Sequence, residues 1–489
     1  MHFIKILKFL LYFKRGFQIK NIKRTYVYLF IVTAFFHTAC TVGPHYKKPT
    51  IKIPSRWSNE TPFTGKDAKK LSKWWTLFED ETLSYLINLA VSSNADIKKT
   101  ILNLKKARLR HQISVSAKLP SVSSGAAAAA TTTNLKNYSQ KTELSIDASW
   151  EIDLFGGLKH QSQATAADYM TNFYNLFSAK VSLSSEIALL YIEIRTLQNR
   201  IISMNKNINL LSETIKLAKM REKAGVSSSG DVEVAIANRE NSLAQLPQLR
   251  ETLNNTILSL ELLLEKQPGA LKRLLTENAQ LPSVPKKISM GIPADIIRQR
   301  PDIIAAESKL IAENARIGVS KAALYPALAL SGGATMDMLA SGTGFSGNIL
   351  ASLAASITAP LLNRTRLKNQ VKIQIHEYEE ARISYKHTVL TALSEVETAL
   401  VSLKFIRHRI LSLKNSMKAF EKALSLVRQS YTAGLTDIVS IVDIERTIIT
   451  AQDTLLSSRG DELKAIIRLF KALGGGWDVE KYGTGKRKK

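Results

Sequence analysis

Two hydrophobic periodicities divide this 489-residue chain into predicted strands and predicted helices. Between residues 144 and 153 apolar and polar side chains alternate strictly, with Leu144, Ile146, Trp150 and Ile152 on one side. A period of two over such a length predicts a strand with one apolar and one polar face. The stretch is also long enough for a tilted strand to cross a bilayer, which takes about 9 to 11 residues. We therefore expect the four named residues to face lipid and the polar face to line water.

Three further stretches extend this pattern. Residues 119–132 form a candidate partner strand that is poor in large side chains, and the later half of the chain repeats the arrangement at 328–336 and 349–358. These stretches predict β-hairpins over 119–154 and 327–360. The hairpins are either embedded in a membrane or placed on the surface of a soluble domain.

Four strands per chain are too few to close a barrel. Exposed strand edges cannot lie in hydrocarbon, because each unpaired backbone group costs several kcal/mol there. If the hairpins are embedded in a membrane, identical chains must therefore complete the sheet. Three copies of four strands would give a barrel of about 12 strands, although the strand count alone does not fix the number of copies.

Two very long segments lack both glycine and proline, namely 158–224 and 361–433. Apolar residues recur in them every three or four positions, which predicts helices with a coiled-coil-like seam. At 1.5 Å per residue they would be about 100 and 110 Å long. Each segment ends at a glycine, where we expect a helix end and a tight reversal, and return helices follow at 231–265 and 437–472.

The chain contains an internal two-fold repeat. A unit at 85–265 recurs at 293–472, with a linker at 266–292 between them, and Arg110 matches Arg316. Each unit contains a helix, a hairpin, a long helix and a return helix. The fold class expected is mainly α with a small β part, in which the long helices form an antiparallel tunnel and the strands form a barrel shared between subunits.

The N-terminus predicts a signal peptide at residues 1–39. Seven basic residues and no acid lie within residues 1–24, and an apolar stretch of 11 residues follows at 26–36. A small residue then precedes Cys40, as in bacterial lipoproteins, although His37 stands where such signals carry an aliphatic residue. We expect a covalent lipid such as palmitate on Cys40 and a lipid-anchored segment at 40–84. The alternative is an ordinary signal peptide with an incidental cysteine.

Composition excludes several classes of function. The net charge is +27, and removing the seven charges of the leader leaves +20. Four more basic residues end the basic C-terminal tail at 473–489, and no patch typical of nucleic-acid binding appears in what remains. One cysteine and eight scattered histidines show no metal-ligand spacing. No phosphate-binding loop or nucleophile elbow is present, so neither a cofactor, a metal nor an enzyme is expected. The charged run at 300–302 is explained by helix initiation at Pro301.

Four short segments resemble the TolC-like outer membrane factors, and among them the NodT-type lipoproteins of RND efflux pumps. They are CTVGPHYKKP at 40–49, WWTLF at 74–78, GIPADIIRQRPDI at 291–303 and KALGGGW at 471–477. The resemblance implies a homotrimer with a 12-stranded barrel in the outer membrane and a helical tunnel extending into the periplasm. It also implies two protein partners, a periplasmic adaptor (membrane fusion) protein and an inner-membrane RND transporter.

The resemblance also implies roles for particular residues. The family pattern places a pore gate near the second helix reversal, which here corresponds to Val439, Asp443 and Arg446. Three copies of Asp443 around a threefold axis would form a narrow negative ring that favours cations. The alternative is a solvated Asp–Arg pair on an ordinary helix.

Adaptor contact is expected at the two reversals, where the alternative is simple helix capping. The residues concerned are Gly225, Ser227, Gly434 and Thr436.

The favoured function is a passive exit duct of a tripartite efflux pump that conducts small toxic compounds or drugs out of the cell. The alternatives are the exit duct of a type I protein secretion system and a coiled-coil surface lipoprotein without a pore. The substrate has no signature in the sequence.

Overall fold

The computed structural model describes residues 41–58, 71–133, 137–276, 280–285, 299–341 and 344–478. The predicted signal peptide, Cys40, part of the linker and most of the basic tail lie outside these residues.

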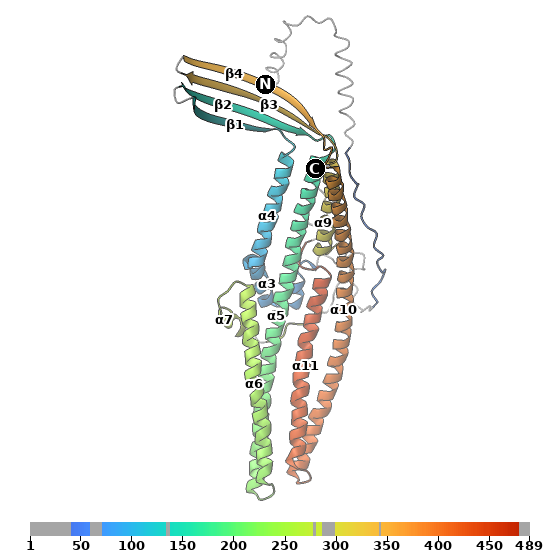
Figure 1. Cartoon of the computed structure of the whole chain (residues 1–489). Coiled ribbons are helices and arrows are strands. Elements are labelled where there is room, and N and C mark those ends of the chain that lie inside the picture. Colours follow the sequence, from blue (N-terminus) through green and yellow to red (C-terminus); the bar gives the residue numbers. More distant parts are fainter. Residues whose placement is uncertain are drawn as a thin grey trace. The chain divides into compact units, whose positions relative to one another are not determined.

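The protein is mainly helical with one small sheet (Figure 1). In chain order the elements are the 3₁₀ helix η3 (Trp74–Phe78), α3 (Glu81–Ser93), α4 (Ala95–Ser116), β1 (Ser121–Thr133), β2 (Asn137–Ile152), α5 (Gly157–Lys223), α6 (Ser229–Leu263), α7 (Lys272–Thr276), α9 (Pro301–Ala322), β3 (Ala327–Ser341), β4 (Gly344–Thr358), α10 (Arg364–Thr432) and α11 (Ile438–Ala472).

The four predicted strands form one antiparallel sheet in the order β1-β2-β3-β4. The hairpins β1–β2 and β3–β4 are joined through the β2–β3 ladder, so β1 and β4 are its edge strands. Within the described chain the same order of helix, hairpin, long helix and return helix occurs twice, from α4 to α6 and from α9 to α11. The gene duplication behind this order stays a prediction.

Strand β2 is longer than its hydrophobic alternation indicates. The alternation begins at Leu144, but the hydrogen-bonded ladder with β1 already begins at Asn137. Residues 137–143 are almost all polar, so pairing with both neighbouring strands, and not an apolar face, specifies this part of the strand.

The predicted long and return helices are present, with ends that differ from the expected ones by at most three residues. Helices α5 and α10 contain 67 and 69 residues, which corresponds to about 100 Å each. The return helices α6 and α11 have polar N-caps, in which Ser228 accepts a hydrogen bond from the Asp231 amide and Asp437 accepts one from the Ser440 amide.

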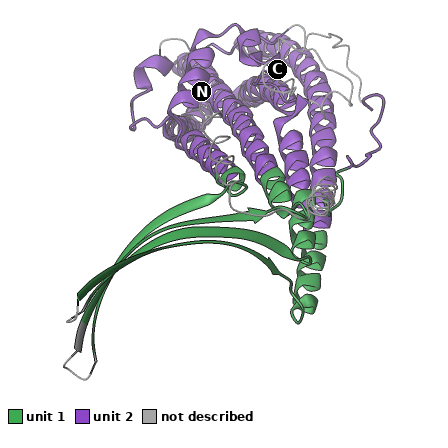
Figure 2. Ribbon diagram, turned by 90° about the horizontal axis from the view of Figure 1, so that it is seen from above, with its two compact units in different colours: residues 1–46, 113–164, 314–376 green, residues 47–112, 165–313, 377–489 purple. Residues whose placement is uncertain are grey.

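The chain divides into two compact units (Figure 2). Unit 1 contains the sheet and the adjoining helix ends, and its described residues are 41–46, 113–133, 137–164, 314–341 and 344–376. Unit 2 contains the remaining helices.

Aromatic packing forms part of the core of unit 2. Trp74 stacks on Phe470 with ring centroids 5.4 Å apart, and Phe78 packs edge-on against both. The WWTLF motif therefore has a structural role, because its two fully buried rings attach η3 to the end of α11.

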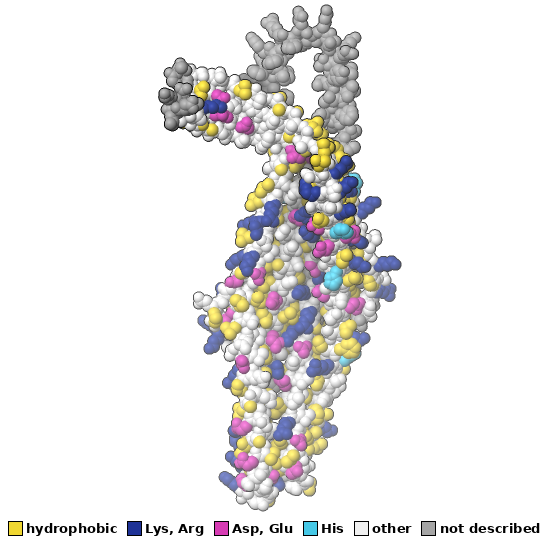
Figure 3. All heavy atoms as spheres, viewed as in Figure 1, with side chains coloured by type: hydrophobic (Ala, Val, Ile, Leu, Met, Phe, Trp, Pro, Cys, Tyr) yellow, Lys and Arg dark blue, Asp and Glu magenta, His cyan; other side chains and the backbone are white. Residues whose placement is uncertain are grey.

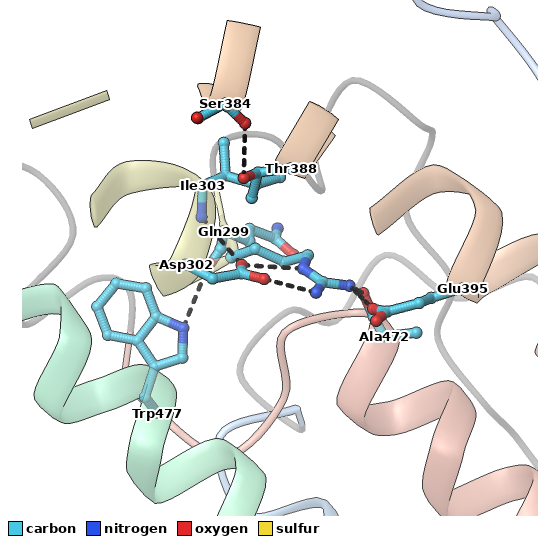
Figure 4. Close-up of polar contacts among 9 residues, drawn as sticks. Gln299, Asp302, Ile303, Ser384, Thr388, Glu395, Ala472 and Trp477 are labelled. Carbon is cyan, nitrogen blue, oxygen red and sulfur yellow. Dashed lines mark hydrogen bonds and ion pairs between the residues drawn. The ribbon is translucent and has the colours of Figure 1, made fainter. Parts of the chain in front are cut away.

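Arg300 joins three elements of unit 2 (Figure 4). Its guanidinium binds Asp302 at 2.6 Å and Glu395 of α10 at 2.6 Å, and it donates to the carbonyl of Ala472 at the end of α11 at 2.9 Å. Burial alone would lower the pKa of Arg300, but the hydrogen bonds and charges of the two carboxylates outweigh it and raise the pKa. The arginine of the RQRPDI segment therefore has a structural role.

We expect Arg300→Ala to lower the melting temperature of the purified full chain. Its side chain is 8% exposed, so removing it leaves Asp302 and a helix carbonyl without their partner, at a cost of about 2–4 kcal/mol. The lost pair with Glu395 contributes the smaller share of this cost, because the Glu395 side chain is about half exposed and solvent screens its charge. The control is Arg382→Ala, whose pair with Glu379 is exposed, with a change of about 0.5 kcal/mol or less. Equal melting temperatures for the two variants would contradict this role.

Candidate functional site

The two faces of the sheet differ in chemistry. Leu144, Ile146, Trp150 and Ile152 share one face of β2, where the first three are exposed and Ile152 is partly exposed. The register continues this apolar face onto the next two strands. Its large members there are Leu328, Leu330, Met336, Ile349, Leu353 and Ile357, of which the last three are 73–88% exposed.

The opposite face carries all the charged side chains of the strands. Glu143 and Asp337 are directly paired across β2 and β3, which would be destabilising for two like charges. Lys141 offsets the repulsion, since its ammonium lies 3.1 Å from the Glu143 carboxylate and 3.3 Å from that of Asp337. With Asp147 and Glu151 this face carries four acids and one base. It is therefore polar and acidic.

The N-terminal segment is held beside the loop that joins β2 to α5. The Val42 amide donates a hydrogen bond to the Phe155 carbonyl, and Asn314 Nδ2 donates to the Pro44 carbonyl, both over 3.1 Å. Cys40 lies outside the described residues, but the segment that begins directly after it is fixed at this end of the sheet.

A close approach of two glycines allows this attachment. Gly43 has φ +149°, and a Cβ there would lie 2.8 Å from His160 Nε2 and 2.9 Å from the Gly318 Cα. A Cβ on Gly318 would itself lie 2.4 Å from the His160 ring. Any side chain at either position would therefore move the segment away from the helices.

The two helix reversals lie at the same end of unit 2 and share one geometry (Figure 1). Gly225 and Gly434 adopt φ of 72° and 77°, which favours glycine. In each reversal the amide of the residue after the glycine donates a hydrogen bond to the carbonyl five positions earlier. The pairs are Val226 to Arg221 and Leu435 to Ser430, and this pattern is a Schellman cap.

The predicted polar contact residues hold the turns that follow these caps. Ser227 Oγ donates to the Asp231 carboxylate at 2.6 Å, and Thr436 Oγ1 donates to Ser440 Oγ at 3.1 Å. The Ser440 amide and hydroxyl donate to Asp437 and lower the pKa of its carboxyl. Both turns are thus preformed.

Two apolar residues at the reversals were missed by the sequence analysis. Val226 and Leu435 follow the two capping glycines and are 60% and 81% exposed. Local pattern predicts the opposite of exposure, because a residue that follows a helix-ending glycine frequently packs back on its own helix. Here both remain exposed.

Arg221 connects the two reversals, and sequence reasoning missed it as well. Its guanidinium lies 4.5 Å from the centre of the Tyr431 ring and donates to the carbonyls of Tyr431 and Thr432 at the end of α10. A basic residue in the last turn of a helix normally binds the carbonyls of that helix. That it reaches a helix more than 200 positions away has no signal in the sequence.

The predicted gate residues lie on α11 near the second reversal. Val439, Asp443 and Arg446 are all exposed, and the Asp443 and Arg446 side chains are 3.9 Å apart. Arg446 Nε also donates to Asn238 Oδ1 of α6 over 3.3 Å. The exposed ion pair itself stabilises little.

A buried polar cluster lies behind the gate residues. Glu445 accepts hydrogen bonds from Thr214 of α5 at 2.7 Å and from Arg428 of α10 at 2.9 Å. Its side chain is 6% exposed, and its second carboxylate oxygen has no hydrogen-bond partner. The cluster therefore ties α11 to both long helices at one level.

No group of three or more His, Cys, Asp or Glu side chains in the described ranges is arranged to hold a metal ion. Among the helices that the structure describes, none combines the length and apolar character needed to cross a membrane.

Comparison with known proteins gives a consistent assignment. Residues 86–265 and 292–475 match the model of the outer membrane efflux protein family, which is well over half of the chain. Nodulation protein T of Rhizobium leguminosarum bv. viciae is 28% identical over 451 residues, covering 91% of this chain and 93% of that protein. The toluene efflux pump outer membrane protein TtgF of Pseudomonas putida is 26% identical over 471 residues, covering 92% and 97%.

A solved structure shows the same fold. The outer-membrane channel OprN superposes with a TM-score of 0.79 at 26% identity, covering 90% of this chain and 100% of that one. Because the family model spans both halves and these similarities run along nearly the whole chain, this protein belongs to the outer membrane efflux protein family.

Proposed function

We propose that this chain is the outer-membrane exit duct of a tripartite efflux pump, conducting small toxic compounds or drugs outward without catalysis. The observation that carries the proposal is the four-stranded sheet, which has one exposed apolar face, one acidic face and two edge strands. Membership of the outer membrane efflux protein family supports the location of that sheet. The efflux pumps named for relatives such as TtgF support the direction and class of transport.

Three copies complete the duct. Their sheets join edge to edge into a barrel of about 12 strands, which satisfies the backbone groups of β1 and β4. The apolar face carrying Leu144, Ile146, Trp150 and Ile152 meets lipid, and the acidic face lines the water-filled path. The long helices of the three copies form an antiparallel tunnel that extends into the periplasm.

Exposed apolar stripes on the helices support the homotrimer. On α10, Ile383, Leu390, Phe405 and Leu426 are 46–65% exposed, and their spacing places them within about 60° around the helix axis. A shorter stripe on α4 contains Leu102, Leu109 and Ile113. Such long stripes are typical of faces that a neighbouring chain covers.

A covalent lipid on Cys40 anchors the chain in the same membrane. The fixed segment after Cys40 lies where β2 ends and α5 begins, which is the periplasmic end of the proposed barrel. Because Cys40 directly precedes this fixed segment, a lipid attached to it would reach the adjacent membrane leaflet without any rearrangement of the backbone.

The helix reversals form the periplasmic end, where the duct is gated. Val439 and Asp443 of three copies converge around the threefold axis, and the Asp443 carboxylates form a ring that favours cations. Opening requires the ends of α10 and α11 to move apart from the first pair of helices. The contacts of Arg221 of α5 with the end of α10, and of Arg446 of α11 with Asn238 of α6, hold the closed state.

The adaptor contacts the same end. Gly225, Ser227, Gly434 and Thr436 shape two rigid turns, and these present Val226 and Leu435 as exposed apolar contacts. An inner-membrane RND transporter supplies the energy for transport.

Conductance tests the function directly. Purified full-length protein should give discrete conductance steps in planar bilayers, with a preference for cations. Asp443→Asn should reduce that preference, because it removes three charges from the narrowest ring. The matched control is Asp461→Asn, which removes the same charge about 27 Å further along α11, away from the proposed ring. Folded protein that gives no conductance would point instead to a surface scaffold without a pore.

Phe405→Glu should shift the detergent-solubilised protein from a trimer to smaller species. It would bury an unpaired carboxylate in the interface, at a cost of several kcal/mol. Lys414→Glu is the control. Lys414 lies nine residues beyond Phe405 on α10, which places it on the opposite side of the helix. Light scattering after size exclusion gives the mass. A Phe405→Glu protein that remains trimeric would show that the stripe on α10 is not an interface.

A further inference from the structure

Charge is segregated within unit 1. The strands carry one Lys and four acids, whereas the described remainder of the unit carries eight basic residues and one acid. The single acid, Asp153, already accepts hydrogen bonds from the amides of Leu158 and Lys159 at 3.1 and 2.7 Å. It is thus engaged at the start of α5. The basic residues are Lys118, Lys159, Arg316, Lys321, Arg364, Arg366, Lys368 and Lys372.

Half of these cations lie in one short stretch beside the sheet. β4 ends at Thr358, and two leucines follow that are among the most exposed apolar side chains described, Leu361 at 82% and Leu362 at 97%. The first turns of α10 then present the α10 basic segment, which consists of Arg364, Arg366, Lys368 and Lys372, all exposed. Figure 3 shows Lys and Arg side chains gathered where the helices adjoin the sheet, whereas the visible sheet carries few.

The helix itself disfavours this arrangement. The first turn of α10 contains no acid, and cations near a helix N-terminus oppose the helix dipole. Arg364, Lys368 and Lys372 follow one another at i, i+4 spacing, where like charges repel. In the described chain none of the four has an ion-pair partner. The segment is therefore a locally unfavourable concentration of positive charge, which an external anionic surface would offset.

We propose that the α10 basic segment binds the anionic phospholipid headgroups of the leaflet that borders the periplasmic end of the barrel. The inference rests on the proposed function, in which the apolar face of β4 lies in lipid. Ile357 is the last large apolar residue of that face, and Leu361 follows within about 14 Å of chain. The exposed leucines then lie among the acyl chains, and the four cations lie at the level of the phosphates.

The continuity of the surface favours a lipid leaflet over a soluble acidic partner. An exposed leucine pair between a lipid-facing strand and a basic helix start is typical of a membrane interface, where apolar and cationic groups act together. Each Lys or Arg near an anionic surface strengthens the attraction about fivefold. In three copies the segments would form a ring of 12 cations around the barrel.

Spin-labelled lipids test the proposal with the full-length protein in phosphatidylcholine vesicles. The fraction of motionally restricted label is measured for phosphatidylglycerol and for phosphatidylcholine. We expect the restricted fraction to favour phosphatidylglycerol about threefold or more, and 0.5 M salt to abolish the preference because salt screens exposed charges. Replacing all four residues of the α10 basic segment with Gln should bring the ratio close to one.

The control variant removes the same charge from the same helix. Lys404→Gln, Lys414→Gln, Lys418→Gln and Lys422→Gln together should leave the preference intact, because these exposed lysines lie at least 32 positions beyond the segment. The charge-conserving pair Arg364→Lys and Arg366→Lys should also retain it. A wild-type ratio of one, or a preference that survives in the four-Gln variant of the segment, would overturn the inference. Absence of restricted label for both lipids would instead contradict the membrane location of the sheet.

Discussion

The backbone groups along the two edges of the sheet constrain the rest of the molecule. β1 and β4 are 13 and 15 residues long, and each pairs with only one neighbour in the chain. In water such edges would be tolerable, but the apolar face between them is too exposed to be a water-facing surface. Lipid suits the face and forbids the open edges. The closed arrangement of several copies that we propose would meet both conditions.

The helical part contains two kinds of contact, buried and exposed, near the two helix reversals. The caps at Gly225 and Gly434 and the buried contacts of Glu445 fix the ends of the helices inside one chain. The contacts of Arg221 and Arg446 are more exposed and involve single side chains. They therefore break more easily than the buried contacts of Glu445, as the gate proposed at this end would require.

The extent to which the sequence predicts this structure varies with the physics of each feature. Strict alternation predicted β2 because one face is apolar, yet it missed residues 137–143, where only backbone pairing defines the strand. The absence of glycine and proline predicted α5 and α10 within a few residues. The stacking of Arg221 on Tyr431 had no signal, because one sequence does not reveal which side chains meet between distant helices.

The candidate site shows the same division. The glycines of the reversals and the four apolar positions of β2 could be found from local pattern alone. The segment after Cys40 could not be placed by pattern, since its position depends on the fit of Gly43 between His160 and Gly318. The acidic character of the polar sheet face needed the register, which brings Glu143 and Asp337 opposite each other.

The two-faced sheet is tested most directly by spin labels placed one at a time along β2, from Leu144 to Glu151, in the protein reconstituted into lipid vesicles. Collisions with oxygen report lipid, and collisions with a water-soluble nickel chelate report water. The account predicts that oxygen access peaks at the even positions and nickel access at the odd positions, with a period of two. Equal access of the nickel chelate to both sets would contradict it.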